Sequence, residues 1–105
     1  MPDARRGEVW LVDLGLAAKV RPALVLSVAA EEIDRALVTL VSHTTSARGS
    51  RFEVPVAAKF LRRGVFDAQN LVTIPQAKLL RRIGRLSDEQ FRLVENAVRS
   101  WLGLE

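Results

Sequence analysis

The residues best suited to chemistry lie at the ends of two apolar segments. Arg21 directly precedes Pro22 and the strand-forming run at 23–28, so its side chain is expected at the rim of a sheet. A guanidinium in that position stays charged, and its planar fork can hold two oxygens of a phosphate at once. An arginine that only flanks a strand in solvent is the alternative.

A second polar group closes the apolar segment at 36–44. Thr44, Thr45 and Ser46 offer three hydroxyls that can hydrogen-bond an anion. His43 carries the only side chain in the sequence whose ordinary pKa lies near neutrality. Because adjacent residues of a strand point to opposite faces, we expect His43 to face away from Thr44. For the hydroxyls alone, a plain polar turn is the alternative interpretation.

Five runs of β-branched and aromatic residues predict the strands that position these groups. The predicted strands span 8–14, 23–28, 36–44, 52–56 and 65–74, the last as one strand or two. Pro22 is expected to open the second strand, and Pro55 places the fourth at an edge of the sheet. The segment at 15–20 is expected to be a loop beside the polar groups, with Lys19 as its only charge.

A helix at 88–102 is the most clearly marked element. Ser87 and Gln90 have the spacing of a capping box, and Gly103 is a typical stop. An apolar stripe recurs at spacings of three and four, made of Phe91, Val94, Val98, Trp101 and Leu102. We therefore expect an α+β, mainly β domain over residues 1–105, in which a C-terminal helix closes a small antiparallel barrel.

Composition limits the possible classes of protein. The 105 residues are 49% hydrophobic and include no cysteine and one histidine, so disulfides, thiolate metal sites and a zinc site are not expected. The apolar runs are far shorter than the roughly 20 residues of a spanning helix, and no signal-peptide core is evident. The sequence predicts a soluble cytoplasmic protein without a cofactor.

Positive charge is concentrated between residues 59 and 85. The net charge is +4, and this basic sector contains seven cationic residues against the single acidic Asp67. The seven are Lys59, Arg62, Arg63, Lys78, Arg81, Arg82 and Arg85. Such a sector attracts phosphates or an acidic protein segment, and a solvated basic face is the alternative.

Several motifs occur in a fixed order over nearly the whole chain. They are RRGEVWLVDL, RPALVLS, a strand ending in SHTTS, VFDAQNLVTIPQAKLL, and RIGRLSDEQ with a terminal WLGL. In order and spacing they resemble the MazF/PemK family of toxin endoribonucleases. The resemblance implies an SH3-like, strongly bent antiparallel barrel of the MazF/PemK/CcdB kind. It also implies a homodimer that cleaves single-stranded RNA without a metal and is neutralised by a cognate antitoxin.

The resemblance also assigns roles to individual residues. Metal-free RNA cleavage needs proton transfer at the 2′- and 5′-oxygens and positive charge on the phosphorane oxygens. The family's catalytic arginine matches Arg21, and the threonine or serine that ends the third strand matches Thr44. The residues expected to bind RNA are Lys19, Thr45, Ser46, Arg48, Gln69 and Asn70.

The sequence departs from some relatives near Gln69. PemK-like relatives place an arginine and an aspartate shortly before this glutamine, whereas Phe66 and Ala68 occupy those positions here. Whether His43 or Asp67 takes part in proton transfer stays open at this stage.

Two other kinds of function are compatible with the sequence. A member of the same fold could act as a protein-binding module, either as a CcdB-like gyrase poison or as an inactive toxin that titrates antitoxin. A non-catalytic nucleic-acid-binding barrel would also use the basic sector. The sequence specifies neither the RNA motif nor the antitoxin.

Overall fold

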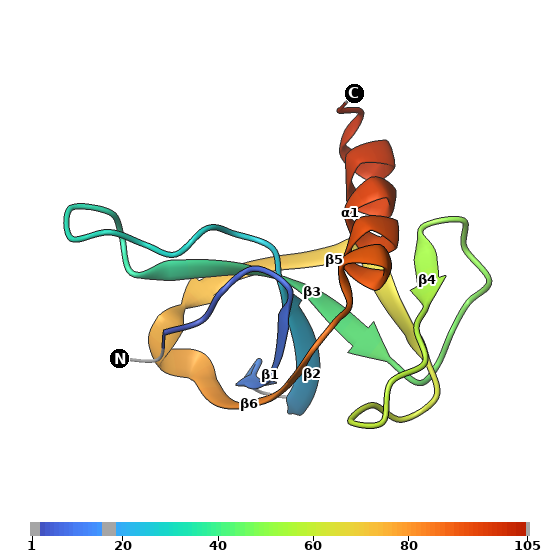
Figure 1. The fold of residues 1–105 in the computed structure, drawn as a ribbon, viewed down its shortest axis with the longest axis horizontal. Helices are drawn as coiled ribbons and strands as arrows, with labels where there is room; N and C mark the ends of the chain where they lie inside the picture. The colour runs from blue at the N-terminus through green and yellow to red at the C-terminus, as the bar shows by residue number, and fades with distance from the viewer. Residues whose placement is uncertain (1–2, 16–18, 105) are drawn as a thin grey trace.

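In the part of the chain that the structure describes, the fold consists of six antiparallel strands and one α-helix (Figure 1). The structure is a computed structural model that describes residues 3–15 and 19–104. The strands are β1 (Glu8–Asp13), β2 (Val20–Val25), β3 (Leu37–Thr44), β4 (Glu53–Pro55), β5 (Val65–Pro75) and β6 (Leu79–Arg85), and the helix is α1 (Asp88–Leu102). A short 3-10 turn, η2 (Gln76–Lys78), joins β5 to β6.

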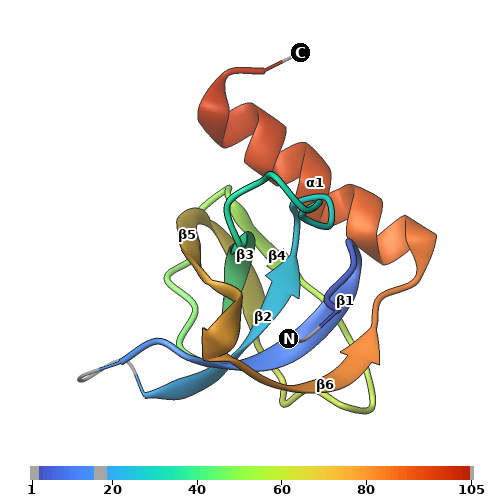
Figure 2. The ribbon, with the colours of Figure 1, turned by 90° about the vertical axis from the view of Figure 1, so that its left-hand side faces the viewer.

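The strands form one curved sheet in the order β4-β5-β3-β2-β1-β6 (Figure 2). Every pair of neighbours in this order is antiparallel. The α+β, mainly β barrel-like sheet with a C-terminal helix is therefore confirmed. Pro55 lies in β4 at one edge of the sheet, as predicted, and the apolar run from 65 forms one continuous strand.

The start of β2 differs from the prediction. This strand begins at Val20, three residues before the predicted 23, so Arg21 lies inside it and not ahead of it. Pairing with β1 extends over residues 20–24, whereas pairing with β3 begins only at Ala23. Pro22 is accommodated because it precedes the β3 ladder, where a missing N–H costs no hydrogen bond.

The strand β6 has no counterpart in the sequence prediction. Its sequence LLRRIGR pairs with β1 through two register shifts. It lies at the second edge of the sheet and has only one neighbouring strand. Exposed cationic side chains are typical of such an edge, and they conceal the apolar alternation on which strand prediction depends.

The helix follows the prediction in its bounds. Ser87 Oγ accepts from the Gln90 N–H, the Gln90 side chain accepts from the Ser87 N–H, and Gly103 has φ 73°. Val94 and Val98 of the predicted stripe are buried. The stripe fails at its C-terminal end, where 43% of Trp101 and 51% of Leu102 are exposed and Phe52 contacts the indole edge-on.

Two apolar clusters support these elements. The larger lies between α1 and the sheet and includes the fully buried Val94, Phe66 and Leu24. The smaller joins β1, β2 and β3 around Val12 and Leu40. Within the described ranges, no helix has the length and apolar character needed to cross a membrane.

Candidate functional site

Arg21 lies where two adjoining cavities meet. It is exposed on β2, opposite Val12 of β1, and it lines both cavities together with His43. Lys19 approaches the same place from the start of β2, where its positive φ of 62° and a hydrogen bond from Leu14 N–H to its carbonyl fix the backbone. Of the predicted loop at 15–20, residues 16–18 lie outside the described part of the chain, and Val20 already belongs to β2.

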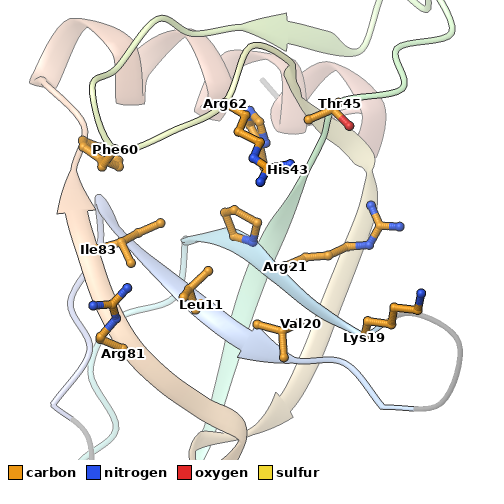
Figure 3. A pocket seen from close by; sticks show the side chains of 11 residues that line it. Leu11, Lys19, Val20, Arg21, His43, Thr45, Phe60, Arg62, Arg81 and Ile83 are labelled. Carbon is orange, nitrogen blue, oxygen red and sulfur yellow. The ribbon is translucent and has the colours of Figure 1, made fainter.

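The first cavity has cationic walls around an apolar floor. Its volume is about 660 Å³. Figure 3 shows Arg81 and Ile83 projecting from β6 on one side, and Arg21 and Lys19 on the other. The lining residues are Leu11, Lys19, Val20, Arg21, Pro22, His43, Thr45, Phe60, Arg62, Arg81 and Ile83.

Two further cavities continue from the first. The second, of about 530 Å³, is lined by Leu14, Arg21, Ser42, His43, Thr44, Ser46, Arg48, Glu53, Asp67, Asn70, Val72 and Ile74. The third, of about 390 Å³, is lined by Arg48, Ser50, Glu53, Asp67, Gln69, Asn70 and Trp101. Because consecutive cavities share residues, we treat all three as one groove.

The groove contains every residue that the sequence singled out as catalytic or RNA-binding. Arg21 and Thr44 line the second cavity together, with Ser46, Arg48 and Asn70. Lys19 and Thr45 belong to the first cavity and Gln69 to the third. The structure thus brings the eight residues together, while their roles in catalysis and binding stay predictions.

Thr44 ends β3 and begins the loop that borders the groove. Its Oγ1 accepts a hydrogen bond of 3.0 Å from the Ser46 N–H. A hydroxyl that accepts in this way keeps its own proton for donation. This hydrogen bond fixes the direction of the Thr44 side chain and is the kind of contact found in a plain polar turn. The Thr44 hydroxyl proton is still able to donate to an anion in the groove.

The Glu53 carboxylate anchors the same loop from β4. Its Oε1 accepts from the backbone N–H groups of Gly49 and Ser50 at 2.8 and 3.0 Å, and its Oε2 accepts from Arg48 N–H at 2.9 Å. The bonds from Arg48 and its neighbours hold the pKa of Glu53 below its usual value. A charged glutamate therefore fixes the backbone that carries Arg48 at the groove.

His43 lies where the first and second cavities adjoin, whereas Thr44 lines the second cavity but neither of the other two. His43 is 3% exposed and packs edge-on against Phe66 at 5.0 Å, yet both His43 and Thr44 line the second cavity. Beyond the register shift between Val41 and His43, His43 pairs with Phe66 and Thr44 with Val65 in regular register, so these two side chains keep the alternation expected of a strand. Burial lowers the pKa of His43, so its imidazole is neutral at pH 7.

The residues around Gln69 show what the departure from PemK-like relatives means. Phe66 and Ala68 are fully buried in the core and present no side chain to the groove. Asp67 lies between them, lines the second and third cavities, and accepts a 3.0 Å hydrogen bond from the Gln69 N–H. Asp67 is the acidic group that this strand offers to the groove.

Sequence reasoning missed part of the wall of the first cavity. Phe60 and Ile83 supply apolar surface there, and Arg62 and Arg81 supply charge. The two arginines belong to the basic sector, and their charge was the signal by which the sequence could have indicated them. The apolar pair had no signal, because Phe60 comes from a connector and Ile83 from the unpredicted strand. Among residues 3–15 and 19–104, no group of three or more His, Asp or Glu side chains could hold a metal ion.

Comparison with known proteins identifies the family of the chain. Residues 5–102 match the family described as PemK-like, MazF-like toxin of type II toxin-antitoxin system. The chain belongs to this family. MazF/PemK membership accounts for the shared order of the motifs and for the curved sheet with its terminal helix.

Proteins similar to this chain align with almost its whole length. The chain is 34% identical over 98 residues to the probable endoribonuclease MazF5 of Mycobacterium tuberculosis, covering 89% of this chain and 87% of that protein. The solved M. tuberculosis toxin MazF-mt6 is 31% identical with a TM-score of 0.77, covering 93% of this chain and 98% of that one. A mycobacterial endoribonuclease solved with its cognate antitoxin is 26% identical with a TM-score of 0.83, covering 97% of each chain.

Proposed function

We propose that this protein is a sequence-specific endoribonuclease toxin that cleaves single-stranded RNA without a metal ion. The 2′-hydroxyl attacks the adjacent phosphate, the bond to the 5′-oxygen breaks, and the products carry a 2′,3′-cyclic phosphate and a 5′-hydroxyl. The observation that carries the proposal is that Arg21 and Thr44 line one cavity in a chain of the MazF/PemK family.

Arg21 supplies the positive charge that this reaction requires. Its guanidinium stabilises the charge that develops on the phosphorane oxygens, and its planar fork can contact two of them. β2 is paired with β1 on one side at this residue, so the Arg21 backbone is held in a regular strand. A rigid backbone lowers the cost of positioning the guanidinium in the transition state.

Thr44 orients the scissile phosphate beside Arg21. Its hydroxyl donates to a phosphate oxygen while Ser46 N–H continues to hold its Oγ1. The adjoining side chains extend the contact along the RNA. Lys19 and Arg48 bind neighbouring phosphates, Thr45 and Ser46 offer hydroxyl contacts, and Gln69 and Asn70 contact bases.

The proposed protein partners follow from the family and its relatives. We infer that the toxin forms a homodimer and is held inactive by a cognate antitoxin. An acidic antitoxin segment would meet the same cationic side chains as the RNA phosphates do, so binding of the antitoxin and of RNA should exclude each other.

The test is cleavage of a long single-stranded RNA by the purified protein in EDTA, with mapping of the new ends. We expect discrete cuts with cyclic-phosphate and 5′-hydroxyl termini. Arg21→Ala should lower kcat/KM by about 10²–10³-fold, the typical effect of removing a group that stabilises transition-state charge. Arg21→Lys should recover only part of this loss, because an ammonium lacks the planar fork.

Two matched variants separate chemistry from general charge and folding. Arg92→Ala removes an exposed arginine of α1 that lies outside the groove, and this variant should cleave RNA like the wild type. Thr44→Val keeps the shape of the side chain and removes only the hydroxyl. RNA left intact by the wild type at low salt, across many sequences, would reject the nuclease proposal and favour a non-catalytic binding function.

A further inference from the structure

We propose that the third cavity is a subsite for one RNA base that carries an exocyclic amino group, with Trp101 as its stacking surface. This inference rests on the proposed nuclease function and adds a substrate preference to it. The cavity lies between the loop before β4, the middle of β5 and the last turn of α1, and neither Arg21 nor Thr44 lines it.

Trp101 is fixed in place but accessible. It comes from the last turn of α1, and 43% of its surface is exposed. Phe52 holds the indole through a T-shaped contact with ring centroids 5.4 Å apart, and the Arg51 guanidinium lies 4.5 Å from the centre of the Phe52 ring. An exposed, supported aromatic ring beside a cationic groove is a typical stacking platform for an unpaired base.

The polar wall of the third cavity suits a base better than a phosphate. Two carboxylates, those of Glu53 and Asp67, oppose the single cation Arg48, so a phosphate would be repelled. Both oxygens of Glu53 already accept from backbone N–H groups. Gln69 and Asn70 add amide groups that can hydrogen-bond the edge of a base.

Asp67 determines which bases fit. One of its oxygens, Oδ1, accepts from the Gln69 N–H, which leaves Oδ2 to accept from a ligand. Carboxylates accept hydrogen bonds from exocyclic amino groups. Adenine, cytosine and guanine carry such a group, whereas uracil carries none, so uracil would leave this acceptor unsatisfied.

The subsite lies next to the reaction centre. The second and third cavities share Arg48, Glu53, Asp67 and Asn70. Thr44 is paired with Val65 on β5, and Asp67 lies two residues further along that strand, a distance of about 7 Å. The base in the subsite therefore belongs to a nucleotide close to the cleaved bond, not to a distant part of the RNA.

The first experiment compares cleavage by the wild type with cleavage by Trp101→Ala, Trp101→Phe and Asp67→Asn. The substrates are short RNAs built around the mapped cut site, with each flanking position changed in turn between uracil and an amino-bearing base. At one position near the cut, the wild type should lose tenfold or more in kcat/KM with uracil. Asp67→Asn should reduce that discrimination, because the amide has a weaker acceptor.

Trp101→Ala should raise KM about tenfold and leave both kcat and the cut site unchanged, because stacking holds the substrate and the transition state equally. Trp101→Phe should retain part of the affinity. Leu102→Ala is the matched control: Leu102 is 51% exposed on the same helical turn but lines none of the three cavities. It should behave like the wild type.

Fluorescence gives a readout that is independent of turnover. Trp10 and Trp101 are the only tryptophans in the sequence. RNA that carries a 2′-deoxynucleotide at the cut site cannot react and should quench wild-type fluorescence, whereas Trp101→Phe, with Trp10 as its only indole, should show little quenching.

The outcomes separate the subsite from the nuclease function. If the wild type cleaves RNA and the Trp101 variants keep its KM, its preferences and its quenching, the subsite is refuted and the nuclease stands. An equal loss in Leu102→Ala, or a changed oligomeric state in the Trp101 variants, would also refute it and make Trp101 a contact between copies. No cleavage by the wild type would reject both proposals.

Discussion

Replacing Gly64 should harm both stability and activity, because this glycine lets the connector after β4 approach the end of β3. A Cβ atom added at this residue would lie 2.2 Å from the Thr44 carbonyl oxygen and 2.9 Å from His43 Cε1. The first of these atoms belongs to a paired strand and cannot rotate away. We therefore predict that Gly64→Ala displaces the backbone of Thr44 or of the connector.

The direction in which Gly64→Ala changes the free energy of unfolding distinguishes a collision from an ordinary replacement of glycine by alanine. Gly64 does not have a left-handed φ, so alanine in open space would stabilise the protein by about 0.4–1 kcal/mol through the unfolded state. Overpacking against a rigid neighbour costs about 1–3 kcal/mol. We expect the collision to prevail and the free energy of unfolding to fall by about 1–2 kcal/mol.

Activity should fall further than stability. A shift of Thr44 by a fraction of an ångström misplaces its hydroxyl relative to Arg21, and a misplacement of about 1 Å can cost about 10²-fold in rate. The assay pairs urea denaturation with kcat on a cleavable RNA, measured at a temperature where wild type and variant are both folded. Gly64→Ala should lower kcat at least tenfold under those conditions.

Gly15→Ala is the control for a change of glycine alone. Among the described residues, nothing would lie within 4 Å of a Cβ added at Gly15, which has φ 75° and lines none of the three cavities. Its replacement should therefore cost stability through backbone strain and leave kcat unchanged. A Gly64→Ala protein as stable and as active as the wild type would refute the close approach of the connector to Thr44.

Two further predictions concern groups that line the groove or support it. Because burial lowers the pKa of His43 below 6.5, the unfolded chain binds more protons than the folded chain below that pH. The free energy of unfolding should therefore decrease as pH falls below about 6.5, and His43 should contribute at most about 1.4 kcal/mol per pH unit to this decrease. If the free energy of unfolding had the same pH slope in His43→Gln as in the wild type, the assignment to His43 would be contradicted. A Cβ at Gly84 would lie 2.4 Å from the Phe60 ring, so Gly84→Ala should destabilise the protein by about 1–3 kcal/mol. Adding Phe60→Ala should cost less than the sum of the two single changes, and strict additivity in urea denaturation would count against this contact.

Local signals were sufficient for the helix and for most of the strands. The capping box at Ser87 and Gln90 and the stop at Gly103 act within one turn each, so the sequence near them determines where α1 begins and ends. The exposure of Trp101, in contrast, could not be predicted from neighbouring residues in the sequence. Its partial exposure depends on the residues that pack beneath the last turn of α1, among them Phe52 from outside the helix, and no spacing within α1 contains that information.

Strand boundaries depended on pairing, which residue types reveal only in part. Arg21 was expected ahead of β2, but β1 extends the strand to Val20 by providing a partner for each residue from there on. β6 was missed because an edge strand with one neighbour tolerates charges at positions where a central strand would need apolar side chains.

The proposed RNA groove was predictable as a set of residues but not as a shape. Motif order placed Arg21 and Thr44 together before any contact was known, because the family's arrangement came with the resemblance. The alternation rule describes the pairing of His43 and Thr44, but it could not show that two adjoining cavities meet at His43, so that this residue borders the groove as well.

The basic sector illustrates why charge along a sequence does not locate a binding surface. Arg81 and Arg82 are neighbours on β6, where alternation directs their side chains to opposite faces. Arg81 lines the first cavity, whereas Arg82 forms a 3.0 Å ion pair with the buried Glu8. Two equal charges in the sequence thus have different uses, since Arg81 borders the groove and Arg82 compensates a buried carboxylate. The positive wall of the groove is therefore set by strand geometry, and the count of cations between residues 59 and 85 overstates what an RNA would meet there.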